Sequence, residues 1–483
     1  MAQTKTTLIA LKLGSALGAL MLAVPAMAQP VPDETEIDET PDVTNTIVVT
    51  ARRTEETLED VPASVSAFDT AALERIQAQD TTGLQGAVPN LNIVQGRGSS
   101  NATNIFIRGV GQPDALQTFD PAVGVYVDDV YLSRIRGTQL DLLDLERVEV
   151  NKGPQGTLYG RNALAGTLNI ITAKPRLGEL SGYAQAEIAN RSSYGAEGAI
   201  NIPVGDTLAV RAAGYYVDRD YGFRNVSTGE QASQLKPAGL EENYAGRLSM
   251  LWEPDDRLSV SVVGDYGKET GTGYPGANIF GAVTATGLRP DKLNLKDVVY
   301  RGMQGDMENE LWGIQGKLSY DFGTFTGELT GSYRSVDFYQ ANASSEGIDY
   351  PGRDLDNFQY DNFSNNFWQT RSQSQVYEAR LSANEDQRFR WNLGGFYFKE
   401  DQAVGYMAVA DRGYCCYSGT EFTMPDVNGE SFAFFGDGTY DITDRLRVFG
   451  GLRYTEEKKS RYGIGGNWAL TLGGEDFACC FAT

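Results

Sequence analysis

The stretch Leu142–Pro175, LLDLERVEVNKGPQGTLYGRNALAGTLNIITAKP, decides the fold of this chain. It places a charged strand, a Gly-Pro-Gln-Gly turn and a glycine-rich loop in close succession. A long series of segments in which polar and apolar residues alternate follows at once. A compact glycine-bearing domain followed by amphipathic strands is typical of an outer-membrane barrel whose interior holds a folded plug.

From Ser181 onward the hydrophobic pattern has a period of two. In residues 257–266, Leu258, Val260 and Val262 share one strand face, and in residues 445–454 Arg447 and Arg453 share the face opposite the apolar one. Ten-residue segments of this kind are the signature of a transmembrane β-barrel, and inward arginines suit a polar lumen. Eleven strands are predicted: 181–190, 195–202, 208–217, 243–252, 257–267, 311–320, 325–337, 375–383, 389–400, 431–440 and 445–457.

The predicted connections alternate between short turns and long segments, as periplasmic turns and external loops do in such barrels. The long segments are 218–242, 268–310, 338–374 and 401–430. Plugged transporters use roughly 22 strands, so eleven strands form about half a wall. Because an open wall would leave unpaired edges in lipid, we expect 177–483 to be the N-terminal part of an incomplete barrel. The chain is then expected to be a fragment or gene remnant that does not insert alone.

The N-terminus has the pattern of a secretory signal. Lys5 and Lys12 supply positive charge, Leu13–Val24 is apolar, and Ala26-Met27-Ala28 is a cleavage pattern, which predicts a signal peptide at 1–28. The alternative, a membrane anchor, is disfavoured because the apolar run is short. Residues 29–45 are acidic, rich in proline and without periodicity, and are therefore expected to be a disordered linker.

Composition excludes several classes of function. A net charge of −23 without a basic stripe disfavours nucleic acid as a partner. The chain has no histidine, which removes Ser-His-Asp and Cys-His catalysis and the common zinc motifs. We therefore predict no catalytic residue, no cofactor and no metal site. The vicinal pairs Cys415-Cys416 and Cys479-Cys480 lack C-x-x-C spacing, so disulfides of undetermined pairing are favoured over a metal.

A β-branched run follows the acidic linker. It consists of Thr46, Ile47, Val48, Val49, Thr50 and Ala51. Two interpretations are open on the chemistry alone: a strand that adds to the sheet edge of another protein, or the first strand of the next domain.

The motifs from residue 46 to about 175 resemble those of the TonB-dependent outer-membrane receptors. TIVVTA at 46–51 matches the TonB box of that family. LEDVPASV, VPNL, IFIRG, VYVDDV and the run from Leu145 to Thr172 follow in the order of the family. The resemblance implies an α+β plug domain at 52–176, followed by an antiparallel transmembrane β-barrel. It also implies a location in the outer membrane of a Gram-negative bacterium, in contact with its lipid, and TonB as the partner of residues 46–51.

The resemblance assigns a structural motif to the plug. Its members are Arg108, Gly109, Asp128, Asp129, Glu146, Arg147, Glu149, Lys152, Gly153, Pro154, Gly156, Tyr159, Gly160 and Arg161. Lys152 departs from the arginine that is common in the family and lacks its planar fork, so we expect a weaker ion pair between plug and barrel there. The glycine loop has neither dinucleotide nor P-loop spacing, and is expected to fold compactly inside the barrel wall. Asp69 or Thr70 and then Asp80 are predicted to cap two short helices, at 71–78 and up to Leu84.

The resemblance implies active import in which TonB, driven by the inner-membrane proton gradient, moves the plug. A ferric siderophore, which brings its own iron ligands, is the commonest implied cargo, while cobalamin, carbohydrate or another organic ligand stays open. A passive porin or adhesin is less favoured because neither needs a plug. An enzyme using carboxylates is also disfavoured: Asp128 and Asp129 are expected on opposite strand faces, as are Glu146 and Glu149, and to form structural ion pairs.

Overall fold

The structure is a computed structural model. It describes residues 48–50, 53, 56–57, 61, 63–78, 80–95, 103–112, 120–133, 143–190, 192–220, 222–225, 239–272, 296–299, 305–343, 347–348, 363–384, 387–411, 416–443 and 446–471. The predicted signal peptide, the predicted linker, and Thr46, Ile47 and Ala51 lie outside this part of the chain. The predicted disulfides concern cysteine side chains that also lie outside it. None of the helices in these ranges has the length and apolar character needed to cross a membrane.

The N-terminal domain is built on a five-stranded mixed sheet. Its strands, in the order β3-β9-β10-β7-β8, are β3 (Ser64–Asp69), β9 (Leu145–Lys152), β10 (Gly166–Thr172), β7 (Val123–Val127) and β8 (Val130–Leu132). The pair β10 and β7 is parallel, and the other pairs are antiparallel. A second sheet joins β4 (Leu91–Gln95), β5 (Thr103–Ile107) and β6 (Val110–Gly111), and β1 (Val48–Val49) pairs with β2 (Glu56–Thr57).

Both predicted helix caps are confirmed; the first helix ends earlier than the predicted residue 78, and the second ends at Leu84 as predicted. Helix α1 spans Thr70–Arg75, and the Asp69 carboxylate accepts a hydrogen bond from the Ala72 amide at 2.7 Å. Asp80 likewise accepts from the Thr82 amide at 2.8 Å, and the helix it begins, η1 (Thr81–Leu84), is a 3-10 helix. These caps satisfy backbone N–H groups that a helix start leaves without a partner.

One apolar core holds the N-terminal domain together. Every residue of β10 is buried, and Leu168 and Ile170 pack with Val148 and Val150 of β9. Gly166, with φ of +151°, lets the two strands approach closely, because a Cβ there would lie 2.1 Å from the carbonyl oxygen of Asn151.

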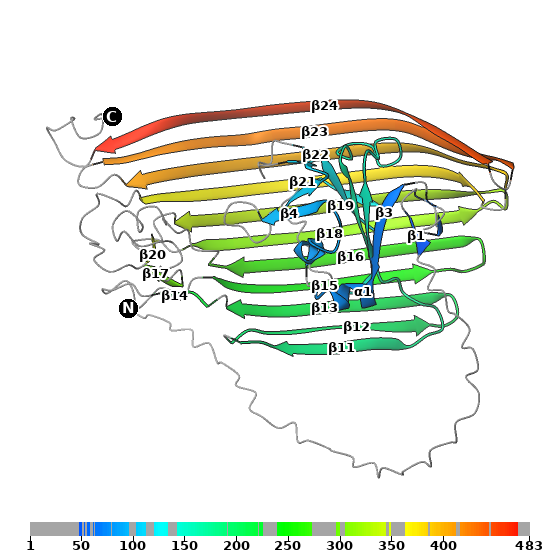
Figure 1. Cartoon of the computed structure of the whole chain (residues 1–483), viewed down its shortest axis with the longest axis horizontal. Coiled ribbons are helices and arrows are strands. Elements are labelled where there is room, and N and C mark those ends of the chain that lie inside the picture. Colours follow the sequence, from blue (N-terminus) through cyan, green and yellow to red (C-terminus); the bar gives the residue numbers. More distant parts are fainter. Residues whose placement is uncertain are drawn as a thin grey trace, which may run out of the picture. The chain divides into compact units, whose positions relative to one another are not determined.

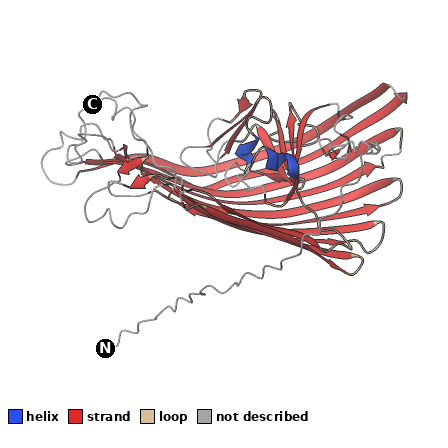
Figure 2. Ribbon diagram, turned by 60° about the horizontal axis from the view of Figure 1, so that its bottom comes forward, coloured by secondary structure: helices blue, strands red, loops and turns tan. Residues whose placement is uncertain are grey.

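The rest of the described chain forms one antiparallel sheet of eleven strands, called here the wall, which is curved and twisted (Figures 1 and 2). Its strands, in sequence order and in sheet order, are β11 (Ser181–Ile188), β12 (Tyr194–Val204), β13 (Leu208–Asp220), β15 (Leu240–Trp252), β16 (Leu258–Gly271), β18 (Asp306–Asp321), β19 (Phe325–Ala343), β21 (Phe363–Ala383), β22 (Phe389–Asp411), β23 (Cys416–Thr443) and β24 (Leu446–Thr471). The eleven predicted strands are therefore confirmed. Among the described residues, β11 and β24 are the terminal strands of this sheet.

The predicted long connections are partly wrong. Residues 401–411 and 416–430 continue β22 and β23, and β19 and β21 likewise extend into the segment 338–374. A small sheet of β14 (Arg224–Asn225), β17 (Asp297–Val299) and β20 (Gly347–Ile348) joins three of the predicted loops. The strands continue because the backbone of a polar residue forms the same hydrogen bonds to a neighbouring strand as the backbone of an apolar one. The alternation of polar and apolar residues therefore does not mark where the strand pairing ends.

The two faces of the wall differ as predicted. On one face Leu446, Val448 and Leu452 are exposed, while on the other Arg453 contacts the N-terminal domain. The exposed face carries a row of aromatic side chains joined by ring contacts across neighbouring strands: Tyr194–Tyr216, Tyr244–Tyr266, Trp312–Tyr333 and Tyr377–Tyr397. Such a row suits the boundary between hydrocarbon and water.

Candidate functional site

The described part of the β-branched run lies inside the N-terminal domain. Val49 is fully buried and packs with Val61, Val65 and Ala67. Val48 and Val49 pair with Thr57 and Glu56. Residues 48–50 therefore fit the second of the two interpretations that the sequence left open, a strand of the domain that follows, because Val48 and Val49 are paired and Val49 is buried.

Glu149 on β9 holds the end of this strand. Its buried carboxylate accepts hydrogen bonds from the amide of Thr50 at 2.8 Å and from Nε of Arg147 at 2.9 Å. The Tyr159 hydroxyl donates to the Thr50 carbonyl at 3.2 Å. Arg147 also pairs with Glu146, so the expectation that Glu146 and Glu149 form structural ion pairs is confirmed.

We expect Glu149→Leu to loosen the strand at Thr50. Removing the carboxylate takes away a charge-assisted hydrogen bond of about 1.5–3 kcal/mol, which corresponds to roughly a tenfold or greater rise in strand opening. The measurement is the rate at which a thiol reagent labels a cysteine placed at Val49. Glu146→Leu is the matched control, because its exposed carboxylate contacts Arg147 and not the strand, and equal labelling rates in the two variants would contradict the role of Glu149.

Arg53 lies between two tyrosine rings behind this strand. Its guanidinium carbon is 4.4 Å from the centroid of Tyr159 and 5.0 Å from that of Tyr126, and its Nη1 is 3.2 Å from the carboxylate of Asp129. Burial raises the pKa of both phenols, which keeps them neutral. Burial alone would also raise the pKa of Asp129, but the charges of Arg53, Lys317 and Arg380 outweigh it and hold that pKa well below its ordinary value.

Asp128 and Asp129 form the turn between β7 and β8. Both have positive φ, 47° and 70°, which gives a tight type I′ hairpin. The expectation that they alternate across a strand is therefore wrong, because they do not belong to one. Asp128 accepts hydrogen bonds from the amide and hydroxyl of Thr172 at 2.8 and 2.7 Å. Asp129 points instead toward Arg53 and toward Lys317 on β18, 3.6 Å away.

The glycine-rich loop lies against the wall, as the sequence predicts. Arg161 pairs with Glu457 of β24 at 2.7 Å and stacks over the ring of Phe398 at 4.6 Å. Gly160 has φ of +84° and lies under the guanidinium of Arg453, where a side chain would meet Nη2 at 2.5 Å. This loop therefore bonds the N-terminal domain to β22–β24.

The remaining predicted motif residues have local roles. Arg108 and Gly109, both with positive φ, make the turn between β5 and β6. Lys152 donates to the hydroxyl of Ser66 at 3.0 Å, a contact that lies within the domain and not at the wall, where an ion pair was expected. The turn that contains Gly153, Pro154 and Gly156 follows β9, and Pro154 and Gly156 are exposed.

A cluster of charges that the sequence did not predict faces Asp129. Lys317 of β18, Glu328 of β19 and Arg380 of β21 form a network, with Lys317 and Glu328 2.7 Å apart and Arg380 bonded to Glu328. These residues occupy strand positions that alternate with the apolar ones, and this pattern could have identified them as residues that face the lumen. Their partner on the N-terminal domain could not be found without the tertiary structure.

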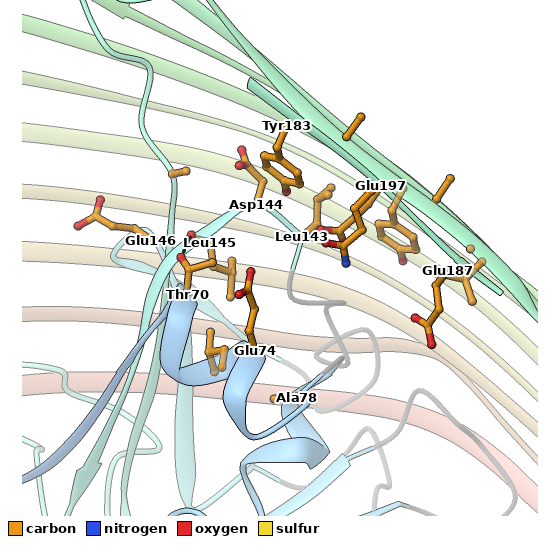
Figure 3. A pocket seen from close by; sticks show the side chains of 18 of the residues that line it. Thr70, Glu74, Ala78, Leu143, Asp144, Leu145, Glu146, Tyr183, Glu187 and Glu197 are labelled. Carbon is orange, nitrogen blue, oxygen red and sulfur yellow. Dashed lines mark hydrogen bonds between the residues drawn. The ribbon is translucent and has the colours of Figure 1, made fainter. Parts of the chain in front are cut away.

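A cavity of about 730 Å³ separates α1 and the start of β9 from strands β11–β13. Figure 3 shows Thr70, Glu74 and Ala78 on the helix side, and Tyr183, Glu187 and Glu197 on the wall side. The lining is rich in charged side chains. The ion pair of Asp144 with Arg211, 2.7 Å between Oδ2 and Nε, connects the two sides.

Comparisons with known proteins agree with this arrangement. Residues 57–167 match the TonB-dependent receptor plug domain. The pesticin receptor of Yersinia enterocolitica is 26% identical over 455 residues, which are 92% of this chain and 59% of that receptor. The vitamin B12 transporter BtuB of Vibrio vulnificus is 34% identical over 219 residues, which are 43% of this chain and 35% of the transporter. The chain therefore spans less than two thirds of the length of these relatives.

The solved structure of the ferric yersiniabactin uptake receptor FyuA from Yersinia pestis has the same fold. It superposes with a TM-score of 0.66 at 19% identity, covering 85% of this chain and 61% of that one. A compact domain bonded to the charged face of an amphipathic antiparallel wall defines a plug-containing outer-membrane barrel protein. Residues 57–167 are a plug domain of the TonB-dependent receptor family, and over most of its length the chain is similar to receptors of the Gram-negative outer membrane. Its N-terminal domain is called the plug below.

Proposed function

We propose that this protein takes part in TonB-dependent import, with TonB pairing to residues 46–51 and pulling on the plug. The observation that carries the proposal is strand β1 (Val48–Val49) with Thr50 after it, which is joined to the plug strand β9 through Glu149. A force applied to this strand reaches the plug directly. The strand is short, and its few backbone partners allow it to exchange β2 for the edge of another sheet.

We propose a ferric siderophore as the cargo. The support comes from relatives: the solved receptors of this fold include proteins described as taking up ferric yersiniabactin and importing ferric catecholates. Cobalamin is the second candidate, because a vitamin B12 transporter is 34% identical to this chain over 219 residues. Growth of the parent bacterium and of a strain lacking the gene, on ferric catecholate, on ferric hydroxamate and on limiting cyanocobalamin, separates the two candidates.

Deleting residues 46–51 from the gene in its own bacterium is expected to reduce energised uptake to background, because TonB then has no strand to pair with. Binding of labelled ferric siderophore to cells is expected to be unchanged, since the deletion leaves the wall intact. The matched control deletes six residues of the acidic linker, 35–40, and should retain uptake. Uptake that survives the first deletion would show that TonB is not coupled through this segment.

A further inference from the structure

A small cavity lies between the plug and four strands of the wall. It has a volume of about 60 Å³, and its lining comes from Leu143 of the plug and from β13, β15, β16 and β18. On β15, Nη1 of Arg247 donates to the Leu143 carbonyl at 2.9 Å, so Arg247 faces the plug. Because side chains alternate along a strand, Ala245 and Asn243 face the plug as well. The cavity is therefore on the inner face of the wall, and its volume is enough for an ion and a few waters.

Three polar side chains that line this cavity form one row across neighbouring strands. Asn243 of β15 is the register partner of Glu269 on β16, and Glu269 is the register partner of Asn309 on β18. Side chains in opposite positions have Cβ atoms about 4.5–5.5 Å apart. On the same face of β16, the residues two before and two after Glu269 are Gly267 and Gly271, which bring no side chain into the space. The oxygen atoms of the row are therefore close enough to share one ligand.

Two amide oxygens of the row are buried and have no hydrogen-bond partner among the described residues. They are Oδ1 of Asn243, a residue that is 6% exposed, and Oδ1 of Asn309, which is 3% exposed. The orientation of the Asn243 amide is fixed, because its Nδ2 donates to the carboxylate of Glu241, and a carboxylate is only an acceptor. Since burying an unpaired oxygen costs free energy, these two atoms favour a ligand that binds oxygen.

The charge beside the two amides is negative. Glu269 lies between them, and Glu241 is bonded to Asn243. Glu241 also lines a second cavity of about 310 Å³ at the ends of the same strands, and the described residues that line this second cavity include no lysine or arginine. Its other carboxylates are those of Asp218, Glu242 and Asp306. A cation that approaches the row from this end therefore meets carboxylates first.

The basic side chains nearby are directed to other groups. Lys268 precedes Glu269 in β16 and so points to the outer face, where it pairs with Glu308 at 2.6 Å. Arg247 bonds the plug carbonyl described above. Arg219 is 3.9 Å from Glu241, which is a long contact. A cation in the row is therefore not replaced by a lysine or arginine of the described chain.

We infer that Asn243, Glu269 and Asn309, with Glu241 beside them, bind a calcium ion. Calcium takes about six to eight oxygen ligands in irregular geometry, including carboxylates, amide carbonyls and waters, whereas magnesium requires a near-ideal octahedron. Among the described residues no three acidic, histidine or cysteine side chains are placed to hold a metal. This site relies instead on two amides, which no motif in the sequence predicts. The ion would join the external ends of β15, β16 and β18, whether or not the chain imports a cargo.

The site is tested by equilibrium dialysis of the purified full chain in detergent against radioactive calcium, after removal of metals with a chelator. We expect about one ion per chain, with half-saturation at roughly 0.1–1 mM. Asn309→Leu keeps the side-chain size and removes the ligand oxygen, and should weaken binding at least about tenfold. Asn309→Asp adds a negative ligand and should tighten binding by a similar factor. Asn392→Leu is the matched control, because Asn392 of β22 is also 3% exposed but lines neither cavity.

Three results would overturn the inference. They are no binding to the parent chain, binding to Asn309→Leu equal to that of the parent, and displacement of calcium by an equal concentration of magnesium. The second of these would mean that calcium is held only adventitiously by surface carboxylates. Trypsin resistance without calcium checks that each variant is folded. If Asn309→Leu does not fold, Asn309→Asp decides, since binding no tighter than the parent's would also contradict the site. Import is not measured, so a failure of the proposed function leaves these outcomes unchanged.

Discussion

Replacing Gly166 with alanine is expected to disrupt the central sheet of the plug. The φ of +151° is unfavourable for an L side chain, and the new Cβ would lie 2.1 Å from the backbone oxygen of Asn151, which cannot move without breaking the β9–β10 pairing. Strain of about 1–3 kcal/mol from the backbone and a similar amount from overpacking add to about 2–6 kcal/mol. Limited trypsin digestion followed by mass spectrometry should show rapid cleavage within the plug.

The matched control for this prediction is Gly86→Ala. Gly86 also has a positive φ, +91°, but a Cβ there would meet nothing within 4 Å. Its cost is therefore the backbone strain alone, about 1–2 kcal/mol, and the plug should remain resistant to trypsin. If the two variants are digested at the same rate, the close approach of β9 and β10 at Gly166 does not contribute to plug stability.

Arg53→Met is expected to have the second largest effect. It removes a cation held between Tyr126 and Tyr159, together with an ion pair to Asp129. Desolvated cation–π contacts contribute about 2 kcal/mol. The lost pair adds less than a buried one would, because the Asp129 side chain is 35% exposed and keeps Lys317 as a partner. We expect a loss of about 3 kcal/mol in plug stability, measured as the urea midpoint of trypsin resistance.

Acid should distinguish this variant from the parent chain. Since the pKa of Asp129 is lowered in the folded state, its ion pairs stabilise the plug above the unfolded pKa of about 4, and this stability is lost as the pH falls further. Arg53 is the largest favourable charge in this effect, so the decline below about pH 4 should be shallower in Arg53→Met. Arg53→Lys keeps the charge and should retain the decline of the parent, and an identical decline in all three chains would contradict this account.

Local sequence patterns were enough to find most of the secondary structure. Alternation such as Leu258, Val260 and Val262 locates a wall strand, because a residue either faces lipid or faces the lumen. The helix caps at Asp69 and Asp80 could also be predicted from the sequence, since a capping side chain bonds to a backbone amide only two or three residues further along the chain. Strand ends could not, because beyond the apolar band pairing depends on the neighbouring strand and not on the residues of the strand itself.

The sequence by itself determined the amphipathic wall, the glycine-rich loop and the order of the plug motifs, because each is written in neighbouring residues. Only the tertiary structure decided that Val49 and Thr50 are docked on β3 and β9, that Asp129 faces Arg53 and Lys317, and that the plug is held by aromatic rings on one side and faces a polar cavity on the other. The physical reason is that these contacts join residues far apart in the chain. Many charged and aromatic side chains could pair with one another, and the packing of the strands decides which of them come into contact. A pattern of neighbouring residues does not predict these contacts.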